Sequence, residues 1–284
     1  MSPVESTKVA GIQCAMTDDV AANVGRAGEL VAEAAARGAQ IVLLPELFAS
    51  RYFPRAPSPQ HFALASAPEQ SLAVQAMRVL ARVHQVVLPV SYFERDGQRF
   101  FNSVIVFDAD GSELGRYRKS HIPDGEGYDE KFFFAPGDTG FRVFDTRYGR
   151  IGIGICWDQW FPECARAMTL LGADLLLYPS AIGSEPVRAE VDTKQPWQRV
   201  MIGHAVANTI PIVATNRVGD EGGQVFFGSS FICDGRGDKL AELDRCEEGV
   251  AIAALDLSAW RKERDWFGLL RDRRPDLYCK LVEG

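Results

Sequence analysis

The sequence predicts an α/β fold in which residues 1–284 form one domain. Apolar stretches of strand length alternate with amphipathic stretches of helical spacing along the whole chain, a pattern typical of layered α/β proteins. No internal repeat, linker or low-complexity segment interrupts this alternation. With 46% hydrophobic and 24% charged residues, the composition is that of an ordinary globular protein, and 284 residues can bury a substantial core.

The first third of the chain predicts two helices and three strands. Residues 21–36 carry apolar side chains at helical spacing, with Thr17 and Asp18 as candidate caps and Gly38 as the end signal. A second helix is expected over residues 68–84. Continuous apolar runs predict buried strands at 8–14, 39–44 and 86–93.

The remainder predicts a hairpin, further strands and three helices. Alternating stretches at 101–107 and 113–117 flank a turn at 108–111, which indicates a hairpin. Further strands are expected at 140–145, 150–155, 173–178, 211–215, 228–233 and 250–255. Helices are expected at 161–171, 196–208 and 257–263. The glycine-rich stretch 219–223 is expected to be a loop, and residues 265–284 an irregular tail.

Charge and hydropathy narrow the possible partners. The formal net charge of -7 argues against nucleic acid or an anionic membrane surface and mildly suits a cationic small molecule. No apolar run approaches the roughly 18 residues that a membrane-spanning helix needs. Residues 1–5 lack the basic and apolar pattern of a signal peptide, so a cytoplasmic location is expected.

The cysteines and histidines predict neither a disulfide framework nor a metal site. The six cysteines contain no CxxC pair, as expected for reduced thiols in the cytoplasm. The four histidines are scattered without the spacing of zinc ligands, so no metal is expected.

Cys156 stands where an apolar strand ends and a helix begins. From Ile151 to Tyr178 the pattern reads strand, sharp turn, helix, strand. Such a junction holds a nucleophile at the edge of a sheet, and helix N-terminal amides favour a thiolate there. The alternative is a buried structural cysteine, because free cysteines often lie in protein cores. Asp158 and Glu163 are expected to be structural, tying the turn and the helix start.

Glu46 and Lys119 stand at two further strand ends. Glu46 directly follows the buried strand 39–44, where a carboxylate is costly unless it is paired or used; a helix-start glutamate is the alternative. Lys119 follows the hairpin and precedes a glycine-rich loop, and a solvated surface lysine is the alternative. Glu130, beside the aromatic run 132–134, is a candidate partner for Lys119.

Glu46, Lys119 and Cys156 together supply an acid–base group, a cation and a thiol. Because strand ends converge in layered α/β folds, these side chains are expected to meet. A thiolate attacks a carbonyl, a carboxylate moves protons and a cation stabilises the oxyanion, which is the minimum set for covalent acyl transfer. No histidine is placed by motif to pair with Cys156, so a papain-like thiol protease fits poorly.

Three motifs resemble those of the nitrilase superfamily of carbon–nitrogen hydrolases. They are Leu44-Pro-Glu46-Leu-Phe, Tyr117-Arg-Lys119-Ser-His-Ile-Pro, and Gly154-Ile-Cys156-Trp-Asp with Phe161-Pro-Glu163. All three occur in the family's order and at its usual separations, and the resemblance extends over essentially the whole chain. It implies a four-layer α-β-β-α sandwich, which in this family usually dimerises, so a homodimer or higher homo-oligomer is expected.

The resemblance also assigns roles to individual residues. It implies that Cys156 is the nucleophile, Glu46 the general base and Lys119 the cation on the oxyanion side. Glu130 matches the family's additional glutamate, which orients Lys119 and the substrate. The backbone N–H of Trp157 would complete the oxyanion hole. Neither a metal nor an organic cofactor is implied.

A narrower resemblance is to the N-carbamoylputrescine amidohydrolases of this superfamily. The segments that carry it are 118–125, 156–163, 178–186 and 271–278. It implies hydrolysis of the ureido C–N bond of a small cationic substrate through a carbamoyl-enzyme. The products would be putrescine, carbon dioxide and ammonia, as in polyamine biosynthesis from arginine or agmatine.

The far end of such a substrate is an alkylammonium group, which calls for a carboxylate with aromatic faces in support. Glu185, in the loop after the strand 173–178, is the leading candidate, and a solvated loop acid is the alternative. Tyr52, Ser180 and Ile182 are secondary candidates, placed only by the proximity of their loops.

Two rival functions stay open at the level of sequence. Another amidase of the superfamily, such as a β-ureidopropionase-like or aliphatic amide enzyme, would share the three residues and differ only in its pocket. An acidic substrate tail would then need an arginine in place of Glu185. The second rival is a non-catalytic binding protein that retains the fold, which the intact Glu46, Lys119 and Cys156 disfavour.

Overall fold

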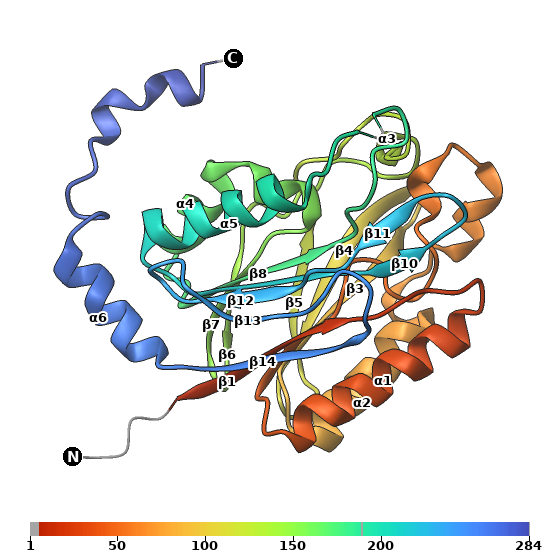
Figure 1. Ribbon diagram of the computed structural model, residues 1–284, viewed down its shortest axis with the longest axis horizontal. Helices are drawn as coiled ribbons and strands as arrows, with labels where there is room; N and C mark the ends of the chain where they lie inside the picture. Colours follow the sequence, from red (N-terminus) through yellow and green to blue (C-terminus); the bar gives the residue numbers. More distant parts are fainter. Residues whose placement is uncertain (1–5, 189, 284) are drawn as a thin grey trace.

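Two β-sheets that face one another across an apolar interior form the framework of the computed structural model, which describes residues 6–188 and 190–283 (Figure 1). The strands of the first sheet are β1 (Thr7–Gln13), β2 (Ile41–Leu43), β3 (Leu88–Asp96), β4 (Arg99–Phe107), β5 (Glu113–Arg118) and β14 (Gly249–Leu255). β1 pairs antiparallel with β14 and parallel with β2. A parallel bridge between Ile41 and Val87 links β2 to the antiparallel meander β3-β4-β5.

The second sheet has the order β13-β12-β9-β8-β7-β6. Its strands are β6 (Val143–Thr146), β7 (Gly149–Ile153), β8 (Leu175–Ser180), β9 (Ile212–Asn216), β12 (Phe231–Cys233) and β13 (Lys239–Glu242). β7, β8 and β9 pair in parallel, so their carboxyl ends lie at one edge of the sheet, while the outer strands pair antiparallel. This shared edge is where Cys156 follows β7 and where the loop after β8 begins.

Helices cover the outer face of each sheet, which gives four layers. The helices are α1 (Val20–Ala36) and α2 (Leu72–His84) on the first sheet, and α4 (Pro162–Leu170) and α5 (Lys194–Asn208) on the second. The two pairs lie on opposite sides of the molecule (Figure 1). Between the sheets, residues such as Val104 and Tyr117 pack against Ile153 and Leu177. The expected α-β-β-α sandwich is therefore confirmed.

Most predicted elements lie within a few residues of their expected bounds, but several local predictions were wrong. Asp19, not Thr17 or Asp18, caps α1, because its Oδ1 accepts the backbone N–H groups of Ala21 and Ala22 at 2.8 and 3.1 Å.

The stretch 219–223 is not a plain loop, since it lies within a hairpin of β10 (Val218–Asp220) and β11 (Val225–Phe227). β13 went unpredicted because it is a four-residue edge strand with mostly exposed side chains and no apolar pattern. The expected helix 257–263 extends as α6 (Leu257–Phe267), past its predicted end.

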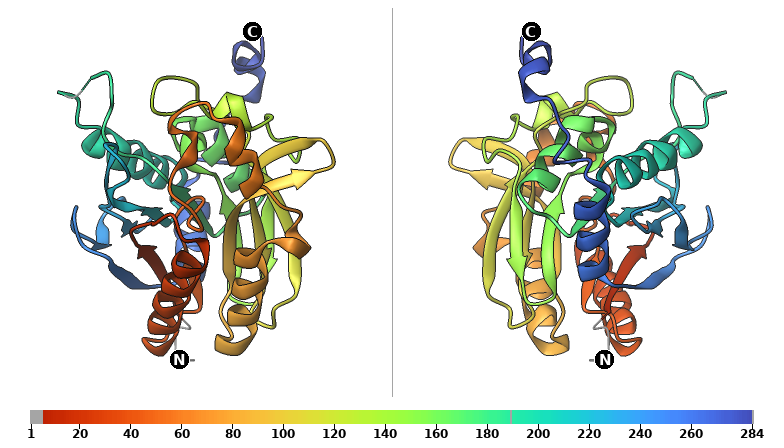
Figure 2. Two further views of the ribbon diagram at one scale, coloured as in Figure 1. Left: turned by 90° about the vertical axis from the view of Figure 1, so that its right-hand side faces the viewer. Right: turned by 90° about the vertical axis from the view of Figure 1, so that its left-hand side faces the viewer.

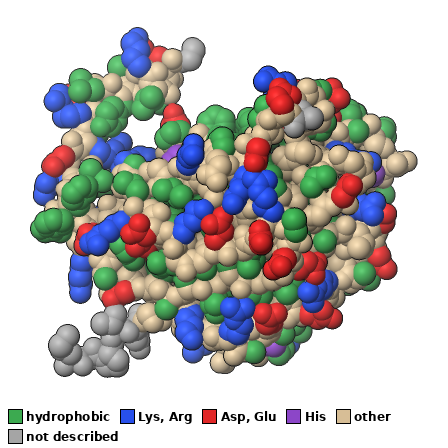
Figure 3. Space-filling view, viewed as in Figure 1, with side chains coloured by type: hydrophobic (Ala, Val, Ile, Leu, Met, Phe, Trp, Pro, Cys, Tyr) green, Lys and Arg blue, Asp and Glu red, His purple; other side chains and the backbone are tan. Residues whose placement is uncertain are grey.

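The segment after α6 stands away from the sandwich in both side views (Figure 2). Its only regular structure among the described residues is two short 3₁₀ helices, Pro275–Leu277 and Cys279–Leu281. Hydrophobic side chains gather on this side of the surface (Figure 3). Trp266 and Phe267, at the end of α6, are 77% and 58% exposed. Within the described residues, no helix is long and apolar enough to cross a membrane. Residues 1–5, on which the expectation about a signal peptide rests, lie outside the described residues.

Candidate active site

Glu46 lies in the loop that follows β2, three residues after the end of the strand. Its side chain is fully buried, and Oε1 accepts hydrogen bonds from Asn102 Nδ2 at 2.6 Å and Lys119 Nζ at 2.9 Å. The next residue, Leu47, has φ of +49°, and its backbone N–H donates to Ser91 Oγ at 2.9 Å. Among the described residues, Glu46 Oε2 has no hydrogen-bond partner. One carboxylate oxygen is thus anchored, and the other is left to act on a reacting group.

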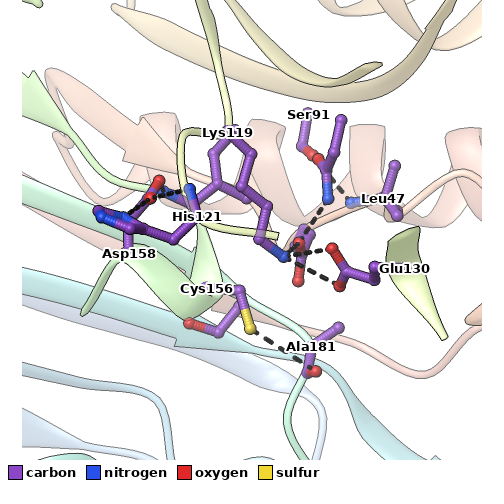
Figure 4. A network of polar contacts seen from close by, with 12 residues as sticks. Leu47, Ser91, Lys119, His121, Glu130, Cys156, Asp158 and Ala181 are labelled. Atoms are coloured by element: carbon purple, nitrogen blue, oxygen red, sulfur yellow. Dashed lines mark hydrogen bonds and ion pairs between the residues drawn. The ribbon is translucent and has the colours of Figure 1, made fainter. Parts of the chain in front are cut away.

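Lys119 extends the pairing of β5 by one residue, because its N–H donates to Asn102 O at 2.9 Å. Side chains alternate along a strand, so Arg118 contacts Glu94 on one face of the sheet while Lys119 lies on the other face. Nζ contacts both oxygens of Glu130, at 2.9 and 2.7 Å (Figure 4). All three charged side chains of the Glu46–Lys119–Glu130 cluster are completely buried. The predicted pairing of Lys119 with Glu130 is therefore present.

The charges in this cluster shift the pKa values of its members. Burial alone would lower the pKa of Lys119, but the carboxylates of Glu130 and Glu46 outweigh it and raise that pKa above its ordinary value. Burial raises the pKa of Glu130, although the ammonium of Lys119 opposes this effect. Lys119 is consequently a permanent cation between two carboxyl groups. Of these two, Glu130 binds a proton at a higher pH than an exposed glutamate does.

Cys156 lies at the sharp turn that the sequence predicted between strand and helix. It follows β7 and opens a short 3₁₀ helix, Cys156–Trp160, before α4 begins. Its φ of +41° is in the left-handed region, which costs an ordinary residue roughly 1–2 kcal/mol. The sulfur lies beside the Lys119 cluster, 3.8 Å from the carbonyl oxygen of Ala181 (Figure 4). The strained turn thus presents Sγ to the buried charges.

The helix amides that favour a thiolate at Cys156 are opposed by burial and by nearby carboxylates. Burial raises the pKa of this thiol well above its ordinary value, the carboxylates of Glu46 and Glu130 raise it further, and Lys119 only partly opposes them. Helix amides favour an anion, but here a fully enclosed sulfur beside two carboxylates outweighs them. The resting group is therefore a thiol, and it needs a base before it can attack.

Asp158 ties the Cys156 turn to the loop that carries Lys119, as its structural assignment predicted. Its Oδ2 accepts from the N–H of Ile155 at 2.9 Å and from Tyr117 OH at 2.7 Å. Its Oδ1 accepts from the N–H of His121 at 3.0 Å and lies 2.7 Å from His121 Nδ1. One buried carboxylate therefore fixes the position of two separate strand ends.

The Trp157 amide lies early enough in the turn to face a ligand. The first hydrogen bond of the 3₁₀ helix runs from the N–H of Asp158 to Ile155 O, so the N–H of Trp157 precedes the internal bonding pattern. The Trp157 side chain is 39% exposed, whereas Cys156 beside it is buried. The expected role of the Trp157 N–H in the oxyanion hole stays a prediction.

Of the secondary candidates for substrate binding, only Tyr52 contacts the Glu46–Lys119–Glu130 cluster. Tyr52 joins the cluster, since its hydroxyl donates to Glu130 Oε1 at 2.6 Å. Ser180 does not, because it is the last residue of β8 and its hydroxyl donates to Gln159 Oε1 at 2.9 Å. Ile182 also points away and packs in the core between the second sheet and its helices. The side chains of Ser180 and Ile182 thus lie on the side of the second sheet that faces its helices, away from the cluster.

Glu185 lies in the loop beyond β8 and is only partly buried. It forms no ion pair with a described residue within 4 Å, and burial raises its pKa. Tyr128, which the sequence reasoning missed, lies between the two regions: its hydroxyl accepts the N–H of Gly183 at 3.0 Å and its ring is 5.8 Å from that of Tyr52. Burial raises the pKa of Tyr128, and the charge of Glu185 raises it further.

Asn102 and Arg217 were also missed, because nothing in their local pattern distinguishes them. Asn102 is an interior position of β4, and only the fold places it against Glu46. Arg217 follows β9 and reaches the backbone of Glu46 from 171 positions away. Among the described residues, no group of three or more His, Cys, Asp or Glu side chains is arranged to hold a metal ion.

Comparison with known proteins agrees with this site. The family model of the carbon-nitrogen hydrolases matches residues 8–265, and the chain belongs to this family. It is 48% identical over 279 residues to a citrullinase from Francisella tularensis, covering 97% of this chain and 98% of that protein. It is 49% identical over 282 residues to an N-carbamoylputrescine amidase from Arabidopsis thaliana, covering 96% and 94%.

Two solved structures share the fold. A carbon-nitrogen hydrolase from Helicobacter pylori has a TM-score of 0.93 at 38% identity, over 98% of this chain and 99% of that one. An amidase from Nesterenkonia has a TM-score of 0.79 at 28% identity, over 96% of both chains, and carries a covalently added acetamide moiety at its active-site cysteine. The protein is therefore a hydrolase of amide or ureido C–N bonds with a cysteine nucleophile.

Proposed function

We propose that this protein hydrolyses N-carbamoylputrescine to putrescine, carbon dioxide and ammonia, with Cys156 as the nucleophile. The observation that carries the proposal is the fully buried Glu46–Lys119–Glu130 cluster beside Sγ. It combines a base with a free carboxylate oxygen, a fixed cation and a protonated thiol in one enclosed space. Such a site matches covalent attack on a weakly electrophilic ureido carbonyl.

In the proposed first half-reaction, Glu46 Oε2 takes the proton of the Cys156 thiol. The sulfur then forms a bond to the carbamoyl carbon, and the carbonyl oxygen becomes an oxyanion that the ammonium of Lys119 and the N–H of Trp157 stabilise. Collapse of this intermediate breaks the bond to the terminal nitrogen. Glu46 returns its proton to that nitrogen, and ammonia leaves a carbamoyl thioester on Cys156.

Water completes the proposed cycle. Glu46 removes a proton from a water molecule, which attacks the thioester carbon, and the C–S bond breaks as Cys156 recovers its proton. The released carbamic acid separates into putrescine and carbon dioxide. Every proton needed is exchanged between Glu46, Cys156, water and the leaving groups, so the scheme balances without a further reactant.

The proposed specificity for a cationic tail rests on Glu185. Its carboxylate forms no ion pair among the described residues, and it lies in the loop that starts near Ala181, whose carbonyl contacts Cys156 Sγ. Tyr128 contacts the N–H of Gly183 in this loop, and can line the path between the reacting carbonyl and an ammonium group. The net charge of -7 also favours the approach of a cation.

Citrulline is the second candidate substrate. The chain is as similar to a citrullinase as to the N-carbamoylputrescine amidases. Citrulline has the same ureido group, but its far end carries a carboxylate beside the ammonium. Arg188 donates its backbone N–H to Glu185 O at 3.1 Å, but its guanidinium pairs with Glu190 at 2.6 Å. A zwitterionic tail that used Arg188 would have to replace this ion pair.

A substrate panel tests the proposal. We expect kcat/KM for N-carbamoylputrescine to exceed the values for citrulline, N-carbamoyl-β-alanine and simple aliphatic amides, with putrescine and ammonia released in equal amounts. A higher kcat/KM for citrulline would move the assignment to the second candidate. A preference for N-carbamoyl-β-alanine or for plain amides would contradict the proposal that the carboxylate of Glu185 binds a cationic tail.

The proposal includes self-association. The exposed apolar side chains of α6 and the following segment, such as Trp266, Phe267, Leu277 and Leu281, would be covered by a second copy of the chain. Light scattering of the purified protein at micromolar concentration tests this, and a strictly monomeric mass would contradict it.

A further inference from the structure

Arg217 is a fully buried arginine that contacts the backbone of the candidate base. It lies between β9 and β10, and none of its side chain is exposed. Nη2 donates to Glu46 O at 2.7 Å and to Leu47 O at 3.1 Å, and Nη1 donates to Ser50 O at 3.1 Å. Three carbonyl groups of one loop thus receive their donors from a single guanidinium.

Glu221 pairs with this arginine and also contacts the backbone of Tyr52. Arg217 Nη1 lies 2.9 and 3.0 Å from the two oxygens of Glu221, which is also almost completely buried. Glu221 Oε2 accepts the backbone N–H of Tyr52 at 2.5 Å. Tyr52 in turn donates its hydroxyl to Glu130, so the pair connects to both carboxylates that flank Lys119.

The loop needs these contacts because it has no regular structure of its own near Glu46. Residues 44–46 follow a three-residue strand, and Leu47 adopts the left-handed φ of +49°. Buried carbonyl groups without a strand or helix partner are costly unless another donor reaches them. The guanidinium also lies 5.6 Å from the ring of Tyr52 and 5.3 Å from that of Phe226, which holds its plane in place.

We infer that Arg217 and Glu221 are positioning residues that fix the direction of the Glu46 carboxylate toward Cys156. Asn102 and Lys119 anchor only Oε1 of Glu46, and the backbone of the loop decides where Oε2 points. A planar guanidinium can bind several carbonyl oxygens and a carboxylate at once, whereas a lysine ammonium is a single point of charge. This inference rests on the proposed role of Glu46 as the base.

The test compares Arg217→Lys with a matched control, Arg264→Lys. Arg264 is also buried and donates to a backbone carbonyl, Ala173 O at 3.0 Å, but at the start of β8, away from the site. We expect Arg217→Lys to lower kcat by about 100-fold with little change in KM, since misplacing a reacting group by 1 Å can cost that much. Arg264→Lys should keep kcat while losing comparable stability. Equal kcat losses in the two variants would overturn the inference.

Alkylation of Cys156 gives a readout that needs no substrate. The rate of reaction with iodoacetamide as a function of pH reports how easily the thiol loses its proton. In Glu46→Gln we expect the profile to shift to lower pH, because the Glu46 carboxylate raises the pKa of the Cys156 thiol. In Arg217→Lys we expect a smaller shift in the same direction, because the carboxylate is then displaced from the sulfur. A profile of Arg217→Lys identical to that of the wild type would overturn the inference. If the wild type hydrolyses no member of the substrate panel, the proposed function fails, yet this profile still tests Arg217.

A double variant guards against a failure to fold. Arg217→Met combined with Glu221→Gln removes both buried charges together, which is often tolerated, whereas removing one leaves an unpaired charge. We expect the double variant to fold, to keep its melting transition and to show the low kcat of Arg217→Lys. Wild-type kcat in the folded double variant would overturn the inference.

Discussion

The hydroxyl of Tyr52 donates a 2.6 Å hydrogen bond to Glu130, the carboxylate that holds the ammonium of Lys119. Burial raises the pKa of Glu130, and this hydrogen bond is one of the contacts that lower it. As the pH falls through that raised pKa, Glu130 gains a proton and Lys119 loses one of its two anions. The acid limb of kcat/KM should therefore lie above the pH expected for an exposed glutamate, about 4.3.

The first prediction is that Tyr52→Phe moves this acid limb to higher pH. Removing a hydrogen bond to the charged form disfavours ionisation, so the limb should shift by roughly half to one pH unit. Tyr92→Phe is the control, because Tyr92 is equally buried but its hydroxyl has no partner among the described residues. The profile of Tyr92→Phe should match that of the wild type. If the acid limb of Tyr52→Phe stays in place or moves to lower pH, the acid limb does not report the titration of Glu130.

The second prediction concerns the nucleophile. Cys156→Ala should abolish ammonia release from N-carbamoylputrescine, because it removes the sulfur beside the Glu46–Lys119–Glu130 cluster. The free energy of unfolding should stay within about 2 kcal/mol of the wild type, as for most single substitutions. Cys164→Ala is the matched control: Cys164 is a buried free cysteine on α4 and should be dispensable for turnover. Residual turnover by Cys156→Ala above the uncatalysed rate would exclude the covalent mechanism.

The positions of Glu46, Lys119 and Cys156 could be predicted because each follows a strand that is recognisable from its own residues. Strand ends meet in this kind of sandwich, so three local patterns were enough to bring the side chains together. Their protonation could not be predicted in the same way. The pKa of Cys156 depends on how completely the site is enclosed and on the carboxylates of Glu46 and Glu130, which are distant in sequence.

Ser180 and Ile182 show why the far side of the site was harder to predict. The strand was expected to end at Tyr178, but β8 continues to Ser180. Side chains alternate along a strand, so this extension directs Ser180 to the same face as Tyr178, toward the helices. Arg217 was missed for a related reason, since its contacts join two loops whose meeting only the complete fold determines.

The third prediction tests the recognition of the substrate tail. Glu185→Gln should lower kcat/KM for N-carbamoylputrescine by about tenfold to a hundredfold, since a hydrogen bond to a charged group contributes about 1.5–3 kcal/mol. A ureide with a neutral tail should lose far less. Glu126→Gln removes an exposed acid from the neighbouring loop and controls for a general change of charge. Equal losses for both substrates in Glu185→Gln would remove Glu185 from the tail site.

The fourth prediction concerns Asp158, which accepts hydrogen bonds at both oxygens from two strand ends. In Asp158→Asn, either orientation of the amide turns its NH₂ group toward a backbone N–H, that of Ile155 or that of His121. One buried donor then has no acceptor, which should lower the free energy of unfolding in urea by about 1–3 kcal/mol. Because Ile155 directly precedes Cys156, kcat should also fall by at least about tenfold, as expected when a reacting atom is displaced.

Asp174→Asn separates these two effects. Asp174 is another buried aspartate that accepts a backbone N–H, from Arg150 at 3.2 Å, and it pairs with Arg261 at the opposite end of β8. This variant should lose similar stability but keep the wild-type kcat. If Asp158→Asn retains the kcat of Asp174→Asn at equal stability, then Asp158 only supports the fold. A lower kcat at equal stability identifies its carboxylate as the group that keeps the Cys156 turn and the Lys119 loop in register.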